Sequence, residues 1–311
     1  MSLNYYQKGE LAAPKLSTPS HYYLKENDPL IAVLNVALHL GMPLLLTGEP
    51  GTGKTKFANH VANHFNLDKP LVFNAKTTSS ASDLFYHYDA VRHFHLAHHN
   101  KMDKDADLMK EQIIRLEALG IAIKKAEEDK KRSVVLIDEI DKAPRDFPND
   151  LLNQMEGDFE FVIPEWNGKS WKAAAALKPI VIITSNSEKY LPEAFLRRCV
   201  YYHIPFPDET DTLVEIVKGQ LASNFYSEGD LAILINKFEA IRQLAQQKDY
   251  KKPATAELIA WLLFLKDSQF EVGDLTNPKS KTLIASISLL AKQEPLRQAI
   301  LEDLEANKTI S

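Results

Sequence analysis

The chain has 311 residues, 45% hydrophobic and 25% charged, which is typical of a soluble globular protein with one large domain or two of ordinary size. Its net charge of −5 argues against nucleic acid as the main partner, and its single cysteine, Cys199, excludes an internal disulfide framework and suits a reducing cytosol. There is no signal pattern at the N-terminus and no unbroken apolar stretch, so we expect a cytoplasmic protein without a membrane span.

The first predicted helix follows an N-terminal arm, residues 1–24, in which prolines and small polar residues indicate loose order. Asp28 and Pro29 predict the start of the helix, because aspartate caps a helix N-terminus and proline fits the first turn. Gly41 predicts its end. The apolar residues 44–47 then predict the first strand of a sheet.

The next eight residues match the phosphate-binding pattern G-x-x-x-x-G-K-[ST], between that strand and a segment with helical spacing. They are Gly48, Glu49, Pro50, Gly51, Thr52, Gly53, Lys54 and Thr55. Glycines let successive backbone N–H groups turn toward phosphate oxygens, and the following helix N-terminus adds partial positive charge. Lys54 can reach the β- and γ-phosphates, and the Thr55 hydroxyl can bind Mg²⁺. A chance glycine-rich turn is the alternative, and the strand-to-helix context disfavours it.

Four further apolar runs, with helical segments between them, predict buried strands of a parallel sheet. They are residues 71–74, 134–138, 180–184 and 200–204. The charge-rich residues from about 101 to 131 predict one or two inserted amphipathic helices, favoured as a solvated surface over an interaction arm. Alternating polarity around the Asn167-Gly168 turn signal predicts a hairpin insert at about residues 158–172.

From residue 208 onward no strand pattern remains, and the apolar spacing is helical. The predicted helices are residues 213–222, 230–247, 254–270, 281–292 and about 294–306. We therefore expect a second, all-helical domain over residues 207–311.

Two acids, Asp138 and Glu139, follow the third predicted strand directly. Open α/β sheets bind ligands at the carboxyl ends of their strands. In that position Asp138 can hold Mg²⁺, and Glu139 is the candidate base that polarises an attacking water. Capping of the strand end is the alternative for such an acid pair.

Four segments together resemble AAA+ ATPases, and more narrowly their MoxR-like branch. They are residues 43–55, 136–143, 184–186 and 191–198, and the resemblance spans roughly residues 25–265. It implies a P-loop NTPase αβα sandwich over residues 25–206, with a five-stranded, mainly parallel sheet. Residues 207–311 would then be the smaller helical lid domain, and ATP with Mg²⁺ the cofactors.

The same resemblance implies roles for three residues beyond the loop and the acid pair. Asn186 would sense the γ-phosphate and help to orient water, against the alternative of a turn residue. Arg198, with Arg197 as its reserve, would reach the ATP of a neighbouring subunit, where a guanidinium offsets charge in the transition state. A structural salt bridge is the alternative for either arginine.

One departure from the family concerns the lid. Many members carry an arginine at the start of a lid helix, whereas the matching residues 252–258 contain none. Lys251 or Lys252 would lack the planar fork of arginine, so the coupling of lid to phosphate is in question.

Candidates for adenine recognition are Tyr23, Leu24 and Ile31, each of which could equally be core.

Histidines are concentrated in one segment, at positions 87, 93, 95, 98 and 99. His95 and His99 have the spacing of a helical metal site, but no cysteine or distant histidine pair completes one, so a solvated or partner-facing insert is favoured. The family resemblance implies that the region after the second strand faces the central pore of a ring, where Phe85 or Tyr86 could grip a substrate. Core packing of these rings is an alternative of at least equal weight.

Trp166 and Trp171 flank the predicted hairpin turn, where they would form either an exposed contact surface or packing against the sheet. Cys199 is expected to be a small buried hydrophobe and not a nucleophile.

The leading hypothesis is an ATP-hydrolysing ring protein, by resemblance a hexamer, that remodels or assembles a protein client in a chaperone-like manner. The MoxR resemblance also implies a von Willebrand factor A protein as a frequent partner. One alternative is a nucleotide-dependent switch or scaffold with slow turnover. Another is a nucleic-acid-associated, restriction-type NTPase subunit, against which the acidic charge argues; the phosphate loop itself does not select ATP over GTP.

Overall fold

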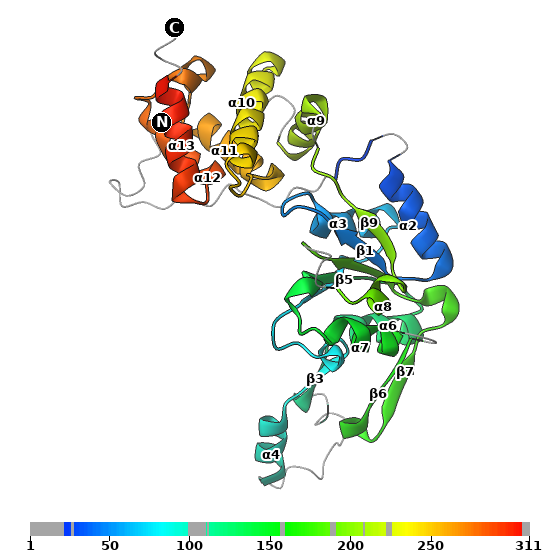
Figure 1. Ribbon diagram of the computed structural model, residues 1–311. Helices are drawn as coiled ribbons and strands as arrows, with labels where there is room; N and C mark the ends of the chain where they lie inside the picture. The colour runs from blue at the N-terminus through cyan, green and yellow to red at the C-terminus, as the bar shows by residue number, and fades with distance from the viewer. Residues whose placement is uncertain are drawn as a thin grey trace. The chain divides into compact units, whose positions relative to one another are not determined.

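A computed structural model describes residues 22–25, 28–98, 110, 112–155, 159–186, 191–207, 209–221 and 226–306. The chain divides into two compact units, and Figure 1 labels many of their helices and strands. The sheet unit comprises residues 25–48 and 53–204. The helical unit comprises residues 205–311 together with the loop segment Glu49–Thr52 and the described residues 22–24. None of the described helices is long and apolar enough to cross a membrane.

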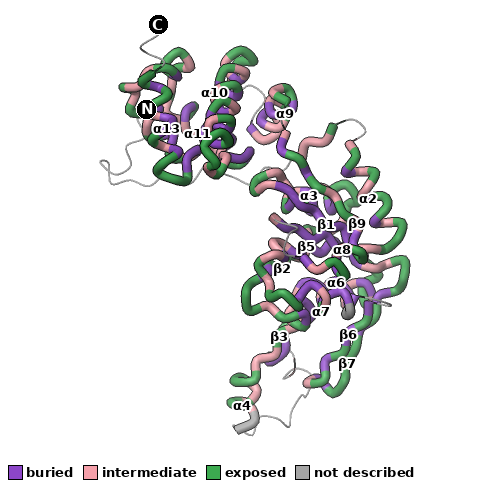
Figure 2. The backbone as a smooth tube through the Cα atoms, viewed as in Figure 1, coloured by how far each residue is buried: buried purple, intermediate pink, exposed green. Residues whose placement is uncertain are grey.

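The sheet unit is built on five parallel strands in the order β2-β5-β8-β1-β9. They are β1 (Leu44–Thr47), β2 (Leu71–Asn74), β5 (Val134–Asp138), β8 (Ile180–Thr184) and β9 (Val200–His203). The three inner strands are buried almost throughout (Figure 2), which explains their continuous apolar sequences. The predicted five-stranded parallel sheet is confirmed.

Helices flank this sheet. They are α2 (Pro29–Leu40), α3 (Lys54–His64), α6 (Ala118–Glu128) and α7 (Phe147–Met155). The Asp28 carboxylate accepts a hydrogen bond of 2.9 Å from the Leu30 N–H, and Gly41 ends α2 in the left-handed region at φ 65°. Both ends of α2 are therefore as predicted.

Helix α6 differs from the solvated insert that the sequence favours. It packs against β2 and β5, and Leu119, Ala122 and Ile123 on its inner face are fully buried. Just before it, β4 (Ile114–Leu116) pairs antiparallel with β3 (Tyr86–Tyr88), a pairing that the sequence analysis missed. Strands of three residues are too short to carry a periodic signal. Residues 101–109 of the predicted insert lie outside the described residues.

The predicted hairpin is present as β6 (Glu160–Ile163) and β7 (Lys169–Lys172). Trp166 and Trp171 are both buried in it, and Trp171 stacks on Phe161 with ring centroids 5.4 Å apart. The Trp171 indole N–H also donates to Glu128 of α6 at 2.8 Å. The packing alternative is therefore the correct one for this tryptophan pair.

The helical unit has its own apolar core. Its helices are α9 (Thr210–Gln220), α10 (Glu228–Gln247), α11 (Thr255–Asp267), α12 (Lys281–Leu290) and α13 (Glu294–Ala306). Phe238, Leu258 and Trp261 are almost fully buried in this core, and the Trp261 indole donates to the Ser286 hydroxyl at 2.9 Å. Further short helices within the described residues are α4 (Ala90–His98), α8 (Glu193–Leu196), η1 (Ala81–Leu84), η2 (Ile140–Lys142), η3 (Pro164–Trp166), η4 (Ala175–Leu177) and η6 (Val272–Thr276).

Candidate nucleotide site

The phosphate loop leaves β1 and enters α3, as its sequence predicts. Gly48, Gly51 and Gly53 all have positive φ, between 82° and 143°, which side chains with a Cβ rarely adopt. Gly53 caps α3, and Lys54 is its first residue. The Lys54 ammonium is nearly buried and donates to the Gly48 carbonyl at 2.8 Å, so it folds back across the loop that would receive phosphate.

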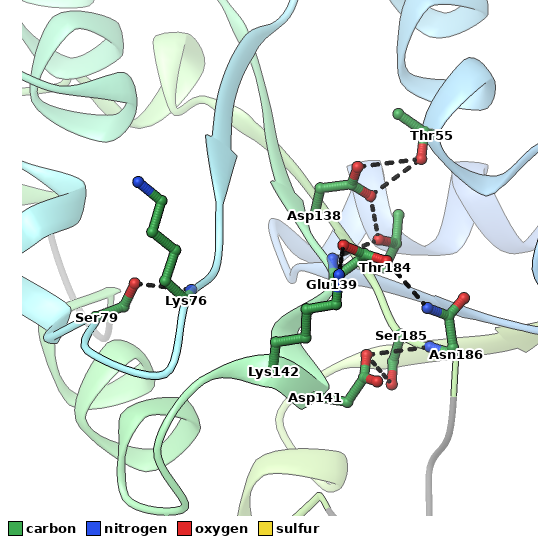
Figure 3. A network of polar contacts seen from close by, with 10 residues as sticks. All are labelled: Thr55, Lys76, Ser79, Asp138, Glu139, Asp141, Lys142, Thr184, Ser185 and Asn186. Atoms are coloured by element: carbon green, nitrogen blue, oxygen red, sulfur yellow. Dashed lines mark hydrogen bonds and ion pairs between the residues drawn. The ribbon is translucent and has the colours of Figure 1, made fainter.

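Thr55 and Asp138 meet at the carboxyl edge of the sheet (Figure 3). The Thr55 hydroxyl lies 3.0 Å from one oxygen of the Asp138 carboxylate and 3.3 Å from the other. A hydroxyl and a carboxylate are oxygen ligands of the kind that Mg²⁺ takes, with nucleotide phosphates and water completing its shell. The two residues therefore fit the magnesium role predicted for them.

Glu139 follows β5 in the left-handed region, at φ 56° and ψ 51°. Its N–H donates to the Thr184 hydroxyl at 2.9 Å, and that hydroxyl donates to the Asp138 carboxylate at 2.5 Å. Thr184 is almost fully buried at the end of β8. This single hydroxyl thus holds both acids in place, a role that the sequence alone did not indicate.

The Glu139 carboxylate is held from two sides, as Figure 3 shows. Asn186 donates its side-chain amide to Glu139 Oε1 at 3.3 Å, so the structure brings these two predicted residues together. On the other side Lys142 Nζ pairs with Glu139 Oε2. The hydrogen bond to Glu139 raises the pKa of Lys142, and nearby Asp141 and Asp138 add to that effect. Lys142 lies within residues 136–143, one of the segments that resemble AAA+ ATPases, but the sequence predicted no role for it.

Within the helical unit, Glu49 of the phosphate loop is bound by two cations. Its carboxylate lies 3.1 Å from Arg242 of α10 and 2.7 Å from Lys252. Partial burial acts to raise the Glu49 pKa, but hydrogen bonds and charge from Lys252 and Arg242 outweigh it and lower the pKa below its usual value.

Arg242 is itself buried and has further partners. It donates to the Pro253 carbonyl and lies over the Phe206 ring, with its central carbon 3.3 Å from the ring centroid. The family resemblance predicts a lid arginine within residues 252–258, which contain none. Arg242 lies ten residues before Lys252, and no local sequence pattern indicates its role.

Arg197 and Arg198 lie after α8, and both are exposed. Arg197 is paired with Glu193 at 2.5 Å, which matches the salt-bridge alternative for this residue. The structure describes no neighbouring subunit, so the role of Arg198 stays a prediction.

Cys199 is buried, and burial raises the pKa of its thiol to about 12, which agrees with a core residue and not a nucleophile.

The remaining candidates show less. Phe85 is buried and packs on Phe161, so its role is core packing, whereas Tyr86 is half-buried and donates to Glu165 at 3.0 Å. Among the described residues no group of three or more His, Cys, Asp or Glu could hold a metal ion. His93 instead contacts the Tyr88 hydroxyl at 2.5 Å, and His99 lies outside the described residues.

Adenine recognition stays a prediction. Tyr23, Leu24 and Ile31 are each half-buried, and this exposure does not distinguish a ligand contact from a core position.

Comparison with protein-family models identifies the family to which this fold and phosphate loop belong. The family model for AAA, the ATPase family associated with various cellular activities, matches residues 44–207, more than half of the chain. The chain therefore belongs to the AAA family. No match is found among curated proteins.

Several solved structures are similar to this chain. A katanin structure concerned with self-assembly is 16% identical to this chain, with a TM-score of 0.41. The match covers 89% of this chain and 82% of the katanin chain. RuvB of Thermotoga maritima is 15% identical over 84% of this chain and 67% of its own, with a TM-score of 0.46. The AAA domain of FIGL-1 in complex with ADP is 21% identical to this chain, with a TM-score of 0.38. The match covers 75% of this chain and 66% of the FIGL-1 chain.

Proposed function

We propose that the chain hydrolyses ATP with Mg²⁺ at the carboxyl edge of its sheet. The observation that carries this proposal is a chain of hydrogen bonds at the carboxyl edge of the sheet. Thr55 bonds to Asp138, Asn186 bonds to Glu139, and the Thr184 hydroxyl joins the two acids. Membership of an ATPase family supports it independently.

Each residue has a distinct task in this proposal. The loop N–H groups and Lys54 bind the phosphates, and Thr55 with Asp138 would hold Mg²⁺, which neutralises charge on the phosphate oxygens when bound. Glu139 accepts a proton from the attacking water, and Asn186 orients that water against the γ-phosphate. Because Lys142 and Asn186 both hold the Glu139 carboxylate, its position is restrained.

The finer part of the proposal is a MoxR-like ring, a hexamer by family, that remodels or assembles a protein client in the cytoplasm. The four quoted motifs support the MoxR-like assignment, and the exposed position of Arg198 supports a role across a subunit boundary. A von Willebrand factor A protein is the partner class that this branch suggests. The loop segment Glu49–Thr52 groups with the helical unit.

The substitution Glu139→Gln tests the hydrolytic role. It removes the base but keeps the size of the side chain, so ATP binding should persist while phosphate release falls at least about a hundredfold. Glu271→Gln, at an exposed position of the helical unit, is the control and should match wild type. The measurements are phosphate release and equilibrium binding of a fluorescent ATP analogue.

Two outcomes would contradict the proposal. Hydrolysis at the wild-type rate in Glu139→Gln would remove the base from this residue. A wild-type protein that binds ATP but shows no turnover would favour the nucleotide-dependent switch.

A further inference from the structure

Asp141 has no assigned role, yet its carboxylate holds the end of β8. It lies on η2, two residues after Glu139. Its Oδ1 atom accepts one hydrogen bond from the Ser185 hydroxyl at 3.0 Å and another from the Asn186 backbone N–H at 3.1 Å. Figure 3 shows Asp141 facing these two residues.

The position of these bonds matters because the sheet ends here. The Ser185 N–H still donates to Leu46 of β1 at 3.0 Å, as the last sheet-like bond of this strand. The next N–H, that of Asn186, donates to Asp141 instead. Asp141 therefore takes the place of a strand partner for Asn186, whose side-chain amide donates to Glu139.

We propose that Asp141 is a positioning residue for hydrolysis, which acts by fixing the Asn186 backbone so that its amide faces Glu139. This inference rests on the proposed ATPase function. Asp141 acts through Asn186, since its two bonds go to Ser185 and Asn186 and neither goes to the base. Loss of its oxygen would release the Asn186 backbone, and a displacement of a positioning group by about 1 Å can cost up to about a hundredfold in rate.

The geometry separates two ways in which Asp141 could matter. Both hydrogen bonds end on the same oxygen, Oδ1. An asparagine offers a carbonyl oxygen with two lone pairs at that position, so Asp141→Asn can keep both bonds while it removes the charge. Positioning predicts that asparagine rescues activity, whereas a requirement for negative charge predicts that it does not.

The test compares Asp141→Ala, Asp141→Asn, Asn186→Ala and the double variant Asp141→Ala/Asn186→Ala in steady-state ATP hydrolysis. Asp141→Ala should lower kcat about tenfold with KM changed less than about twofold, and Asp141→Asn should keep at least about half of the wild-type kcat. The double variant should be no slower than Asn186→Ala, because residues that act as one unit are not additive. Asp146→Ala, an exposed acid on the segment after η2, is the control and should match wild type.

A second readout does not depend on turnover. Amide hydrogen exchange at Asn186 should become at least about tenfold faster in Asp141→Ala and stay near wild type in Asp141→Asn. If Asp141→Ala fails to bind nucleotide, Asp141→Ser replaces it, because serine keeps a polar group but is too short to reach both donors.

Three results would overturn the inference: an unchanged kcat in Asp141→Ala, additive losses in the double variant, or an Asp141→Asn variant as slow as Asp141→Ala. Absent turnover in wild type would instead remove the proposed function, and with it the catalytic meaning of Asp141. Unchanged exchange at Asn186 would refute the positioning geometry even then, so the two failures are distinguishable.

Discussion

At the scale of single residues, charge pairing decides how the phosphate loop is held. Glu49 occupies a variable position of the loop pattern, and no local rule assigns it a partner. In the helical unit it has two, Arg242 and Lys252, and the first is buried against the Phe206 ring. A buried guanidinium needs a compensating charge, so Glu49 and Arg242 depend on each other.

This pair predicts a pH dependence of stability. Because the folded-state pKa of Glu49 is lowered, the contribution of Glu49 to stability is complete above the ordinary glutamate pKa of 4.5 and is lost as the pH falls through the lowered value. Glu49→Gln should therefore be less stable than wild type at neutral pH, by about 1 kcal/mol or less because the carboxylate is 34% exposed. Urea unfolding from about pH 7 to about pH 3 should show the difference shrinking, and a difference constant across that range would refute the assignment.

At the scale of elements, helix α6 and the segment before β3 approach each other unusually closely. The Phe85 carbonyl accepts the Glu117 N–H at 2.9 Å just before α6 begins. A Cβ added at Gly120 would lie 2.0 Å from that same carbonyl oxygen. Glycine is therefore required at this position for packing, and its backbone needs no unusual conformation there.

Gly120→Ala and Gly229→Ala form a matched pair that tests this contact. Gly229 is also helical, but a Cβ there would meet no atom within 4 Å. Gly120→Ala should destabilise the protein by about 1–3 kcal/mol or more, because the clash involves backbone that cannot easily move. Gly229→Ala should be neutral or stabilising by up to about 1 kcal/mol. Equal unfolding midpoints for the two variants would show that α6 does not pack on Phe85 in this way.

At the scale of the whole molecule, the two compact units and the exposed Arg198 bear on assembly. If Arg198 serves the site of a neighbouring subunit, a base and an arginine from different chains make one active site. Glu139→Gln keeps the arginine and lacks the base, whereas Arg198→Ala keeps the base and lacks the arginine. Each variant alone should then be inactive for a different reason.

Mixing these two variants should restore hydrolysis. In a randomly mixed ring about a quarter of the sites combine an intact base with an intact arginine, so activity should rise well above that of either variant alone. Arg197→Ala is the matched control and should stay active, because Arg197 is already paired with Glu193. The mass of the complex with and without ATP gives the assembly state. A monomer under both conditions, or a mixture no faster than its parts, would remove the shared site.

Much of this architecture follows from local sequence patterns. The apolar runs predicted four of the five strands at their observed bounds and the fifth to within one residue, because strands buried on both faces are continuously apolar. Asp28 and Gly41 predicted both ends of α2, since capping depends only on neighbouring residues. The phosphate loop and the pair Asp138 and Glu139 could likewise be found from sequence alone.

Only the tertiary structure decided which side chains pair across distant parts of the chain. Asp141 and Ser185 are 44 residues apart, and Glu49 and Arg242 are 193 residues apart, so no local spacing relates them. The buried face of α6 was missed for the same reason, because it depends on a surface supplied by β2 and β5. The sequence determined which groups could bind and hydrolyse a nucleotide, and folding determined which side chains hold those groups in position.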